Sequence, residues 1–357
     1  MFGSGAAGME ESAHQPAADG GREEATKRPG AVCAPRQELA DRDSIAGERP
    51  LVAVVGPTGS GKSELALRIA GEFGGEIVNC DSLQVFRHFD IGTAKLTPAE
   101  RRGIPHHLLD IVDPDELFTA GEYARIARQA IGEIAARGRL PVVAGGTGFY
   151  LRALLDGLFA GPARDQALRD RLAERERRRP GSLHRLLRRF DAASAARIHA
   201  NDVPKVTRAL EVCLLTRRPV TELFQEGRDS LRGYRALKLG LLPDRDALYA
   251  RLDARCARMF EGGLVEEVRH ILGLGFPPEA KPFESHGYKQ ALQLIRGELS
   301  PRDALFYAQR NTRHYAKRQI TWFRREPGLV WLRGFGEEAA VQEEALRRVR
   351  EFLVSAN

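Results

Sequence analysis

The chain has 357 residues, 43% of them hydrophobic, which suits a globular protein of one large domain or two smaller ones. It contains no run of about 18 apolar residues and no apolar segment followed by a cleavage site near its start, so neither a membrane span nor a secretory signal is expected. The cysteines are scattered (Cys33, Cys80, Cys213, Cys256) and form no zinc-binding spacing. Reduced thiols in a cytoplasmic protein are therefore predicted.

Charge is unevenly distributed along the chain. Residues 1–49 carry nine acids and six bases, a net charge of −3, so the total of +7 leaves +10 on the rest. This first segment is rich in Gly, Ala, Glu, Arg and Pro and shows no apolar period. It is predicted to be a disordered N-terminal extension, with order beginning at Pro50.

After the extension, short apolar runs alternate with helical patterns. An apolar run at 51–55 predicts a buried parallel strand, and helices are predicted over 62–73 and 123–137. Further strands are predicted over 76–80, 140–144, 236–242 and, more briefly, 329–332. The fold class is therefore α/β, a P-loop core with a parallel sheet flanked by helices. Ligands of such sheets bind at the carboxyl ends of the strands.

The pattern changes between residues 162 and 207, where strand signals vanish and Arg-rich helical stretches appear. Residues 164–218 contain fifteen Lys or Arg and seven acids, and residues 310–325 contain six bases and no acid. The predicted organisation is a discontinuous catalytic core (50–161 and 208–357) and a helical insertion (162–207). Basic patches attract polyanions, but charge alone leaves a nucleic-acid site and a solvated helix face about equally open.

A phosphate-binding loop follows the first predicted strand and precedes the first helix. It fits G-x-x-x-x-G-K-[ST] at every fixed position, with the residues Gly56, Pro57, Thr58, Gly59, Ser60, Gly61, Lys62 and Ser63. Glycines let the backbone N–H groups approach phosphate oxygens. Lys62 supplies a positive charge, and the Ser63 hydroxyl is a predicted ligand of Mg²⁺.

Two further loops end the neighbouring strands. Asp81 follows the second strand, where a carboxylate could hold Mg²⁺ or accept a proton, although it could also serve only as a turn residue. Gly145-Gly146-Thr147-Gly148 ends the third strand without an acid. NTPases often carry a Walker-B aspartate near such a strand end, so its absence disfavours a plain ATPase.

Together these loops resemble the tRNA dimethylallyltransferase family. The resemblance spans about residues 50–325 and includes the phosphate loop, Asp81-Ser82 with Gln84, Asp90 to Lys95, Asp110 to Pro114, Gly145 to Thr147 with Tyr150, Arg197 to His199 with Asn201-Asp202, Arg208 to Val212, Gly287 to Gln290, and Ala316 to Gln319 through Trp322. The family implies transfer of a dimethylallyl group from dimethylallyl diphosphate to N6 of the adenosine that follows the anticodon (position 37), with Mg²⁺, tRNA and the diphosphate substrate as partners. In this reading the phosphate loop binds the leaving group, with Lys62 among the catalytic residues.

The resemblance also implies roles for individual residues. Asp81 corresponds to the general base at N6, and Thr147 to a threonine in the channel where base and diphosphate meet. Residues implied to contact tRNA are Asp81, Ser82, Leu83, Gln84, Thr147, Arg169, Pro204, Lys205, Val206, Thr207 and Arg208. The chain departs from the family where Pro204 replaces Gln, Lys205 replaces Arg, and Phe86 replaces the usual Tyr.

Alternatives remain open at this level. A P-loop nucleotide or small-molecule kinase would use the same loop for ATP, a non-enzymatic RNA-binding protein would keep it as a relic, and a relative that prenylates free adenine nucleotides would not need the Arg-rich insertion. Arg251, Arg255, Lys317 and Arg318 could serve the diphosphate or the RNA, or could be helix-surface charges. The histidines at 106, 107 and 199 lack a third metal ligand at a sensible spacing. A monomer is expected.

Overall fold

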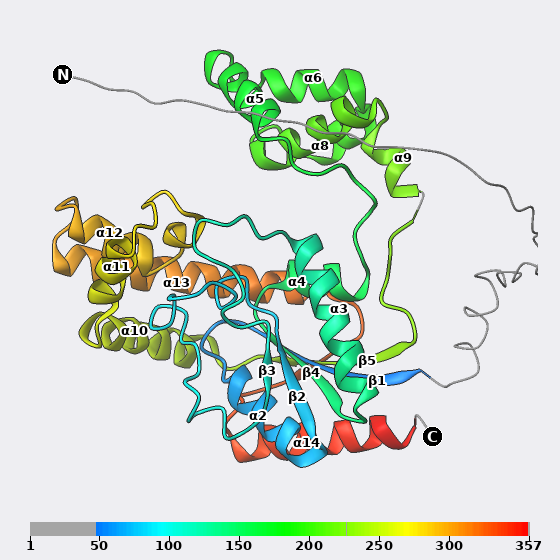
Figure 1. The fold of residues 1–357 in the computed structure, drawn as a ribbon, viewed down its shortest axis with the longest axis vertical. Coiled ribbons are helices and arrows are strands. Elements are labelled where there is room, and N and C mark those ends of the chain that lie inside the picture. The colour runs from blue at the N-terminus through cyan, green and yellow to red at the C-terminus, as the bar shows by residue number, and fades with distance from the viewer. Residues whose placement is uncertain (1–47, 226, 356–357) are drawn as a thin grey trace, which may run out of the picture. The chain divides into compact units, whose positions relative to one another are not determined.

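The computed structural model describes residues 48–225 and 227–355 (Figure 1). The extension predicted over 1–49 lies outside this range except for its last two residues. Arg49 begins the first strand, so regular structure starts one residue before the predicted Pro50. Within the described range, no helix is long and apolar enough to cross a membrane.

A parallel sheet of six strands forms the centre of the fold, in the order β3-β2-β4-β1-β5-β6. The strands are β1 (Arg49–Val55), β2 (Gly75–Asn79), β3 (His106–His107), β4 (Leu140–Gly145), β5 (Tyr234–Leu241) and β6 (Leu329–Leu332). The predicted parallel α/β fold is confirmed. Strand β3 was not predicted, because two histidines pairing with Ile77 and Val78 make no apolar pattern.

Helices cover both faces of the sheet. On one face, α2 (Lys62–Phe73) and α14 (Ala339–Val354) pack against Val52 and Val54; on the other, α3 (Ala120–Ala136) and α4 (Gly148–Leu155) pack against Leu51, Ala53 and Val55 (Figure 1). Strand β1 is apolar throughout this stretch because both of its faces are buried. The same double burial keeps its carboxyl end, and the loop that follows, in a fixed position.

A second group of helices lies beyond the carboxyl ends of the strands. It consists of α10 (Arg245–Glu261), α11 (Leu264–Gly273), the 3₁₀ helix η1 (Lys281–Glu284), α12 (Tyr288–Ile295) and α13 (Pro301–Phe323). Phe86 and Phe89 from the loop after β2 pack with Leu264 and Tyr288 in a separate apolar cluster. The Tyr288 hydroxyl accepts a hydrogen bond from Gly92 N at 3.0 Å, and this contact fastens the loop to α12.

The Arg-rich region forms a helical insertion with its own apolar core. Its helices are α5 (Gln166–Arg178), α6 (Ser182–Phe190), α7 (Ala192–Arg197), α8 (Val203–Thr216) and α9 (Val220–Gln225). The boundary predicted at residue 207 falls inside α8, and the core extends from Leu172 to Leu223. The buried side chains of α8 on both sides of that boundary, from Val206 to Cys213, belong to this one core.

Candidate active site

Three loops meet where β1, β2 and β4 end. The backbone N–H of Thr147 donates to Cys80 O at 3.1 Å, and Cys80 N donates to Ala144 O at 2.8 Å. A Cβ at Gly145 would collide with the Cys80 backbone, so only glycine permits this approach. The sequence prediction that the loops share one edge of the sheet agrees with this geometry.

The phosphate loop is held from two sides. Gly59 and Gly61 have φ angles of 78° and 84°, which lie in the left-handed region that favours glycine. A Cβ at Gly59 would lie 2.6 Å from Leu252 of α10, and one at Gly61 would lie 2.7 Å from the Gly336 backbone N. Close packing against α10 and the segment before α14 therefore excludes side chains here and fixes the loop at the N-terminus of α2.

The Lys62 ammonium lies inside a cavity of about 420 Å³ formed by this loop. Its Nζ donates to Pro57 O at 2.8 Å. Burial lowers the Lys62 pKa to about 8, an effect that the Asp81 charge opposes and the Arg255 charge reinforces. Ser63, Asp81 and Gln84 also line the cavity. The structure thus brings together the predicted phosphate-binding residues and the predicted base.

Arginines from α10 complete the positive lining of this cavity. Arg251, Arg255 and Arg258, spaced by four and three residues, all face it. Arg255 Nη2 donates to Thr58 Oγ1 at 2.6 Å, and its buried Nε has no hydrogen-bond partner among the described residues. Burial lowers the Arg255 pKa. The sequence left its role open, although the helical spacing of the three arginines was already visible.

Asp81 and Thr147 belong to the two loops that follow β2 and β4, and Ser82 joins these loops by hydrogen bonds. One carboxylate oxygen of Asp81 accepts the backbone N–H of Leu83 at 2.9 Å, which holds the turn. Thr147 Oγ1 accepts the backbone N–H of Ser82 at 3.0 Å and donates to Ser82 Oγ at 3.2 Å. Gln84 Nε2 donates to Thr93 O at 3.1 Å. The segment predicted to contact tRNA is therefore ordered by hydrogen bonds to its neighbours.

Two side chains of α13 reach the same edge. Gln319 Oε1 accepts the backbone N–H of Thr58 at 2.7 Å, while its Nε2 donates to Gly146 O at 2.8 Å. This amide joins the phosphate loop to the loop after β4. The Tyr315 pKa is raised by burial and by the Asp81 charge, while a hydrogen bond with the Thr147 side chain acts in the opposite direction. Sequence reasoning placed Gln319 in a family motif but gave it no role.

A narrow apolar cavity adjoins the phosphate cavity. Thr58, Asp81 and Arg255 line both of them. The remaining wall combines the apolar side chains of Leu83, Cys256, Met259, Phe260 and Leu264 with the polar side chains of Thr93, His286, Thr312 and Tyr315. At its edge, burial lowers the His286 pKa to about 4, helped by the charges of Arg318 and His314. Asp81 thus lines both the cavity of the phosphate loop and the narrow recess beside it.

In the insertion, Arg169 and Arg208 converge on a carboxylate. Arg169 donates to Glu211 at 2.8 and 2.7 Å, and Arg208 donates to Glu211 at 2.6 Å and to Pro162 O at 2.9 Å. Glu211 is fully buried; desolvation raises its pKa, but the two arginines outweigh this and hold it at about 2. The family resemblance implied that both arginines contact tRNA; in the structure both are engaged by the buried carboxylate of Glu211.

The other predicted RNA residues of α8 differ in exposure. The first turn contains Pro204, which explains how proline can replace glutamine there, because a first-turn N–H has no helical acceptor. Lys205 is exposed and its Nζ donates to Asp202 at 2.5 Å. Thr207 is half-buried, whereas the Val206 side chain is buried in the insertion core. Only the backbone of Val206 could meet a ligand.

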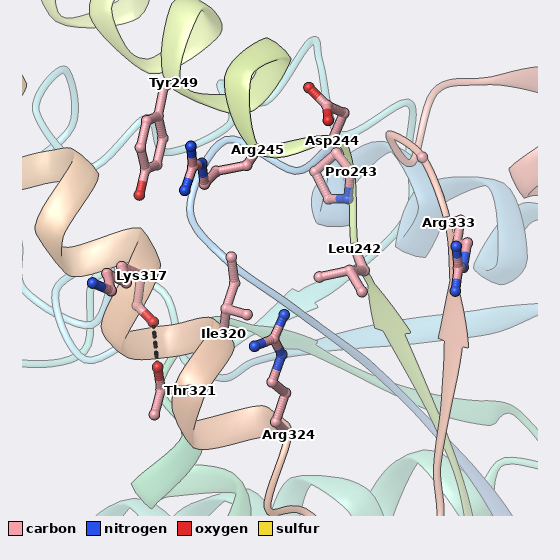
Figure 2. Close-up of a pocket in the computed structure, with 11 residues that line it drawn as sticks. Leu242, Pro243, Asp244, Arg245, Tyr249, Lys317, Ile320, Thr321, Arg324 and Arg333 are labelled. Carbon is pink, nitrogen blue, oxygen red and sulfur yellow. Dashed lines mark hydrogen bonds between the residues drawn. The ribbon is translucent and has the colours of Figure 1, made fainter.

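The outer face of α13 borders a basic groove of about 670 Å³ (Figure 2). Arg245 and Tyr249 of α10 lie across it from Lys317, Ile320 and Arg324, and Arg333 follows β6. Its one carboxylate, Asp244, accepts the N–H groups of Asp246 and Ala247 as the cap of α10. A second groove shares Lys317 and Thr321 and adds Arg152, Arg318, Trp322 and Arg325.

The phosphate cavity fits a Mg²⁺ ion that arrives with a polyphosphate. Ser63 offers a hydroxyl and Asp81 a carboxylate in the same cavity. Mg²⁺ is usually held by one or two such groups together with substrate phosphates and water. Among the residues described, no group of three or more His, Cys, Asp or Glu could hold a metal by itself.

The fold and the site define a class of protein: a P-loop α/β protein in which the phosphate loop, a carboxylate and a partly apolar recess lie at one edge of the sheet. The family model described as IPP transferase matches residues 84–326. The chain is 78% identical to the tRNA dimethylallyltransferase of Solibacter usitatus, over 85% of this chain and 99% of that protein. It is 55% identical to the enzyme of the same name from Koribacter versatilis, over 84% and 98%.

Solved structures agree with these relatives. The tRNA isopentenylpyrophosphate transferase of Bacillus halodurans is 34% identical and covers 87% of this chain and 96% of its own, with a TM-score of 0.63. A eukaryotic dimethylallyltransferase acting on tRNA is 28% identical, covers 86% and 80%, and has a TM-score of 0.75. The chain therefore belongs to the IPP transferase family and is a prenyltransferase, which confirms the family predicted from the sequence motifs.

Proposed function

We propose that this enzyme transfers a dimethylallyl group from dimethylallyl diphosphate to N6 of adenosine 37 in tRNA. The observation that carries the proposal is the position of Asp81, which lines both the phosphate cavity and the apolar recess. A prenyl diphosphate needs both: charge for its diphosphate and an apolar wall for its five-carbon group. The kinase alternative is the weaker one, because the loop after β4 carries no Walker-B acid and the relatives are named tRNA dimethylallyltransferases.

The diphosphate end meets the cationic lining of the larger cavity. Lys62 and Arg255 supply positive charge. The Arg255 Nε, which has no hydrogen-bond partner among the described residues, is a free donor for a diphosphate oxygen. Backbone N–H groups at the start of α2 add a favourable dipole. A bound Mg²⁺, with Ser63 among its ligands, would neutralise further charge on the departing diphosphate. These groups stabilise the leaving group where its negative charge develops.

Asp81 acts on the other reactant. The exocyclic amine of adenine is a weak nucleophile, because its lone pair is delocalised into the ring. As N6 bonds to C1 of the dimethylallyl group, the bond from C1 to the diphosphate oxygen breaks, and the Asp81 carboxylate accepts the N6 proton. One oxygen of Asp81 is oriented by Leu83 N. The products are N6-dimethylallyladenosine, diphosphate and a protonated Asp81 that returns its proton to solvent.

Thr147 and Gln319 fix the positions of the loops that carry the base and the phosphate-binding residues. Thr147 orders the Ser82 turn that follows the base, and Gln319 joins the phosphate loop to the loop after β4. A displacement of about 1 Å between reacting groups can cost a hundredfold in rate. The adenosine must leave its stack to reach this position, as bases do in other enzymes that modify them.

The RNA backbone is bound by positive surface outside the reaction site. The grooves along α13, with Lys317, Arg318 and Arg324 among their cations, and the exposed Lys205 of the insertion provide it. Such contacts position the RNA without reading its sequence.

The enzyme acts in the cytoplasm as a monomer.

The decisive experiment is mass spectrometry of tRNA nucleosides after incubation with the protein, dimethylallyl diphosphate and Mg²⁺. We expect an adenosine heavier by one dimethylallyl group, confined to the position after the anticodon. A parallel reaction with labelled ATP and no prenyl donor tests the kinase alternative. Phosphate transfer from ATP without prenyl transfer would overturn the proposal.

The role of Asp81 is tested by Asp81→Ala. We expect single-turnover transfer to fall by about 10²- to 10⁴-fold, the range of general base catalysis. Binding of tRNA, measured by fluorescence anisotropy, should remain largely intact because the basic surfaces are unchanged. Near-normal turnover of the variant would refute the assignment of the base.

A further inference from the structure

An acidic residue stands among the cations of the phosphate cavity without a role in the reaction proposed above. Besides Asp81, the carboxylates that line the cavity are Glu64 and Glu337. Glu64 faces outward to Arg102, with which it forms two hydrogen bonds of 2.8 Å. Glu337 instead pairs with Arg251, one of the three arginines that α10 directs at the cavity.

The pair is held at the mouth of the cavity by a short segment between β6 and α14. Gly336 N donates to Ser60 O at 2.9 Å, so this segment is bound to the phosphate loop itself. The Arg251 guanidinium lies 4.7 Å from the centre of the Phe335 ring. A Cβ at Gly61 would collide with Glu337 Oε2, which shows how close this carboxylate lies to the start of α2.

Such an arrangement opposes the binding of an anion. The N-terminus of a helix and a nearby arginine both attract phosphate, whereas a carboxylate beside them repels it and occupies the arginine. Arg251 and Glu337 are each 39% exposed, so the pair is solvated enough to exchange partners. By contrast, Arg255 is buried and makes no ion pair among the described residues.

We propose that Glu337 is a positioning residue that withholds Arg251 from the diphosphate. A bound diphosphate and Glu337 compete for the same guanidinium. The competition lowers the affinity for the diphosphate product and hastens its release, while Arg255 and Lys62 are left to stabilise the leaving group. The inference rests on the proposed function, because it assumes that the diphosphate binds in this cavity.

The test measures binding of inorganic diphosphate with Mg²⁺ by calorimetry, for the wild type, Glu337→Gln, Arg251→Ala and the double variant. Glutamine keeps the shape of Glu337 and removes its charge. We expect Glu337→Gln to bind diphosphate about two- to fivefold more tightly, the range that a half-exposed ion pair can contribute. Arg251→Ala should cost less than about twofold in the wild type and about fivefold in the Glu337→Gln background.

The control is Glu343→Gln on the exposed side of α14, which removes the same charge from a residue that does not line the cavity and should leave binding unchanged. Equal costs of Arg251→Ala in both backgrounds would overturn the inference. So would weaker binding by Glu337→Gln together with a raised Mg²⁺ requirement, which would make Glu337 a metal ligand. If the wild type bound neither inorganic nor dimethylallyl diphosphate, the proposed function would fail first.

Discussion

Two clusters of arginine in this protein look alike in the sequence but differ in what neutralises them. In the insertion, Arg169 and Arg208 converge on the buried carboxylate of Glu211. At the phosphate cavity, Arg255 is buried with an unpartnered Nε, and among the described residues its only side-chain hydrogen bond is to Thr58. An arginine that forms an ion pair with a buried carboxylate is expected to stabilise the fold. A buried arginine without such a partner is instead a candidate for binding an anionic ligand.

Arg255→Met provides the sharpest test of this difference. Methionine fills similar space without charge, so kcat/KM should fall by about 10²- to 10³-fold, as when a donor to a developing anion is removed. The melting temperature should stay the same or rise, because a desolvated charge is removed. Steady-state kinetics and thermal unfolding followed by circular dichroism measure both. A loss of stability together with unchanged kinetics would place Arg255 with the structural arginines.

Glu211→Gln should show the opposite pattern. It leaves Arg169 and Arg208 without their counter-charge, so we expect a loss of about 2 kcal/mol in urea unfolding; their partial exposure keeps this below the roughly 3–5 kcal/mol of fully buried pairs. Because the Glu211 pKa is lowered to about 2, the contribution is complete above its ordinary value of 4.5 and disappears as the pH falls toward 2. Glu174→Gln, which breaks surface pairs in the same insertion, is the control and should cost little.

The pH dependence of kcat/KM tests whether the charge of Lys62 contributes to substrate binding in the cavity. Its pKa of about 8 means that its charge is lost as the pH rises above that value. The substrate phosphate is already ionised there, since its last pKa is about 6. We expect kcat/KM for dimethylallyl diphosphate to fall above about pH 8 by up to tenfold per unit. Lys62→Arg, which stays charged, should abolish this fall; an unchanged profile would assign the titration to another group.

Lys205→Ala has the smallest expected effect. The side chain is exposed, and its ion pair with Asp202 is of the surface kind. We expect tRNA binding to weaken a few-fold and the salt dependence of binding to lose about one phosphate contact. Arg269→Ala, which removes a similar exposed pair on α11, should change neither. An unchanged salt slope for Lys205→Ala would exclude a phosphate contact.

Local patterns carried most of the fold prediction. The glycines and Lys62 identified the phosphate loop, because positive φ angles and close packing restrict those positions to glycine. Strand β3 was not predicted, because a strand of two residues has no period to detect. The sequence left the role of Arg255 open and assigned none to Gln319, because the contacts of each are with residues roughly 170 to 260 positions away in the chain.

The sequence by itself therefore determined the parallel α/β core, the phosphate loop and the family, because those depend on residue types at fixed local spacing. Only the tertiary structure decided which cations are available to a ligand. Whether an arginine meets Glu211, Glu337 or an open cavity depends on contacts between distant segments. Burial then determines the consequence, because a charge removed from water must find a partner within the fold or in a ligand.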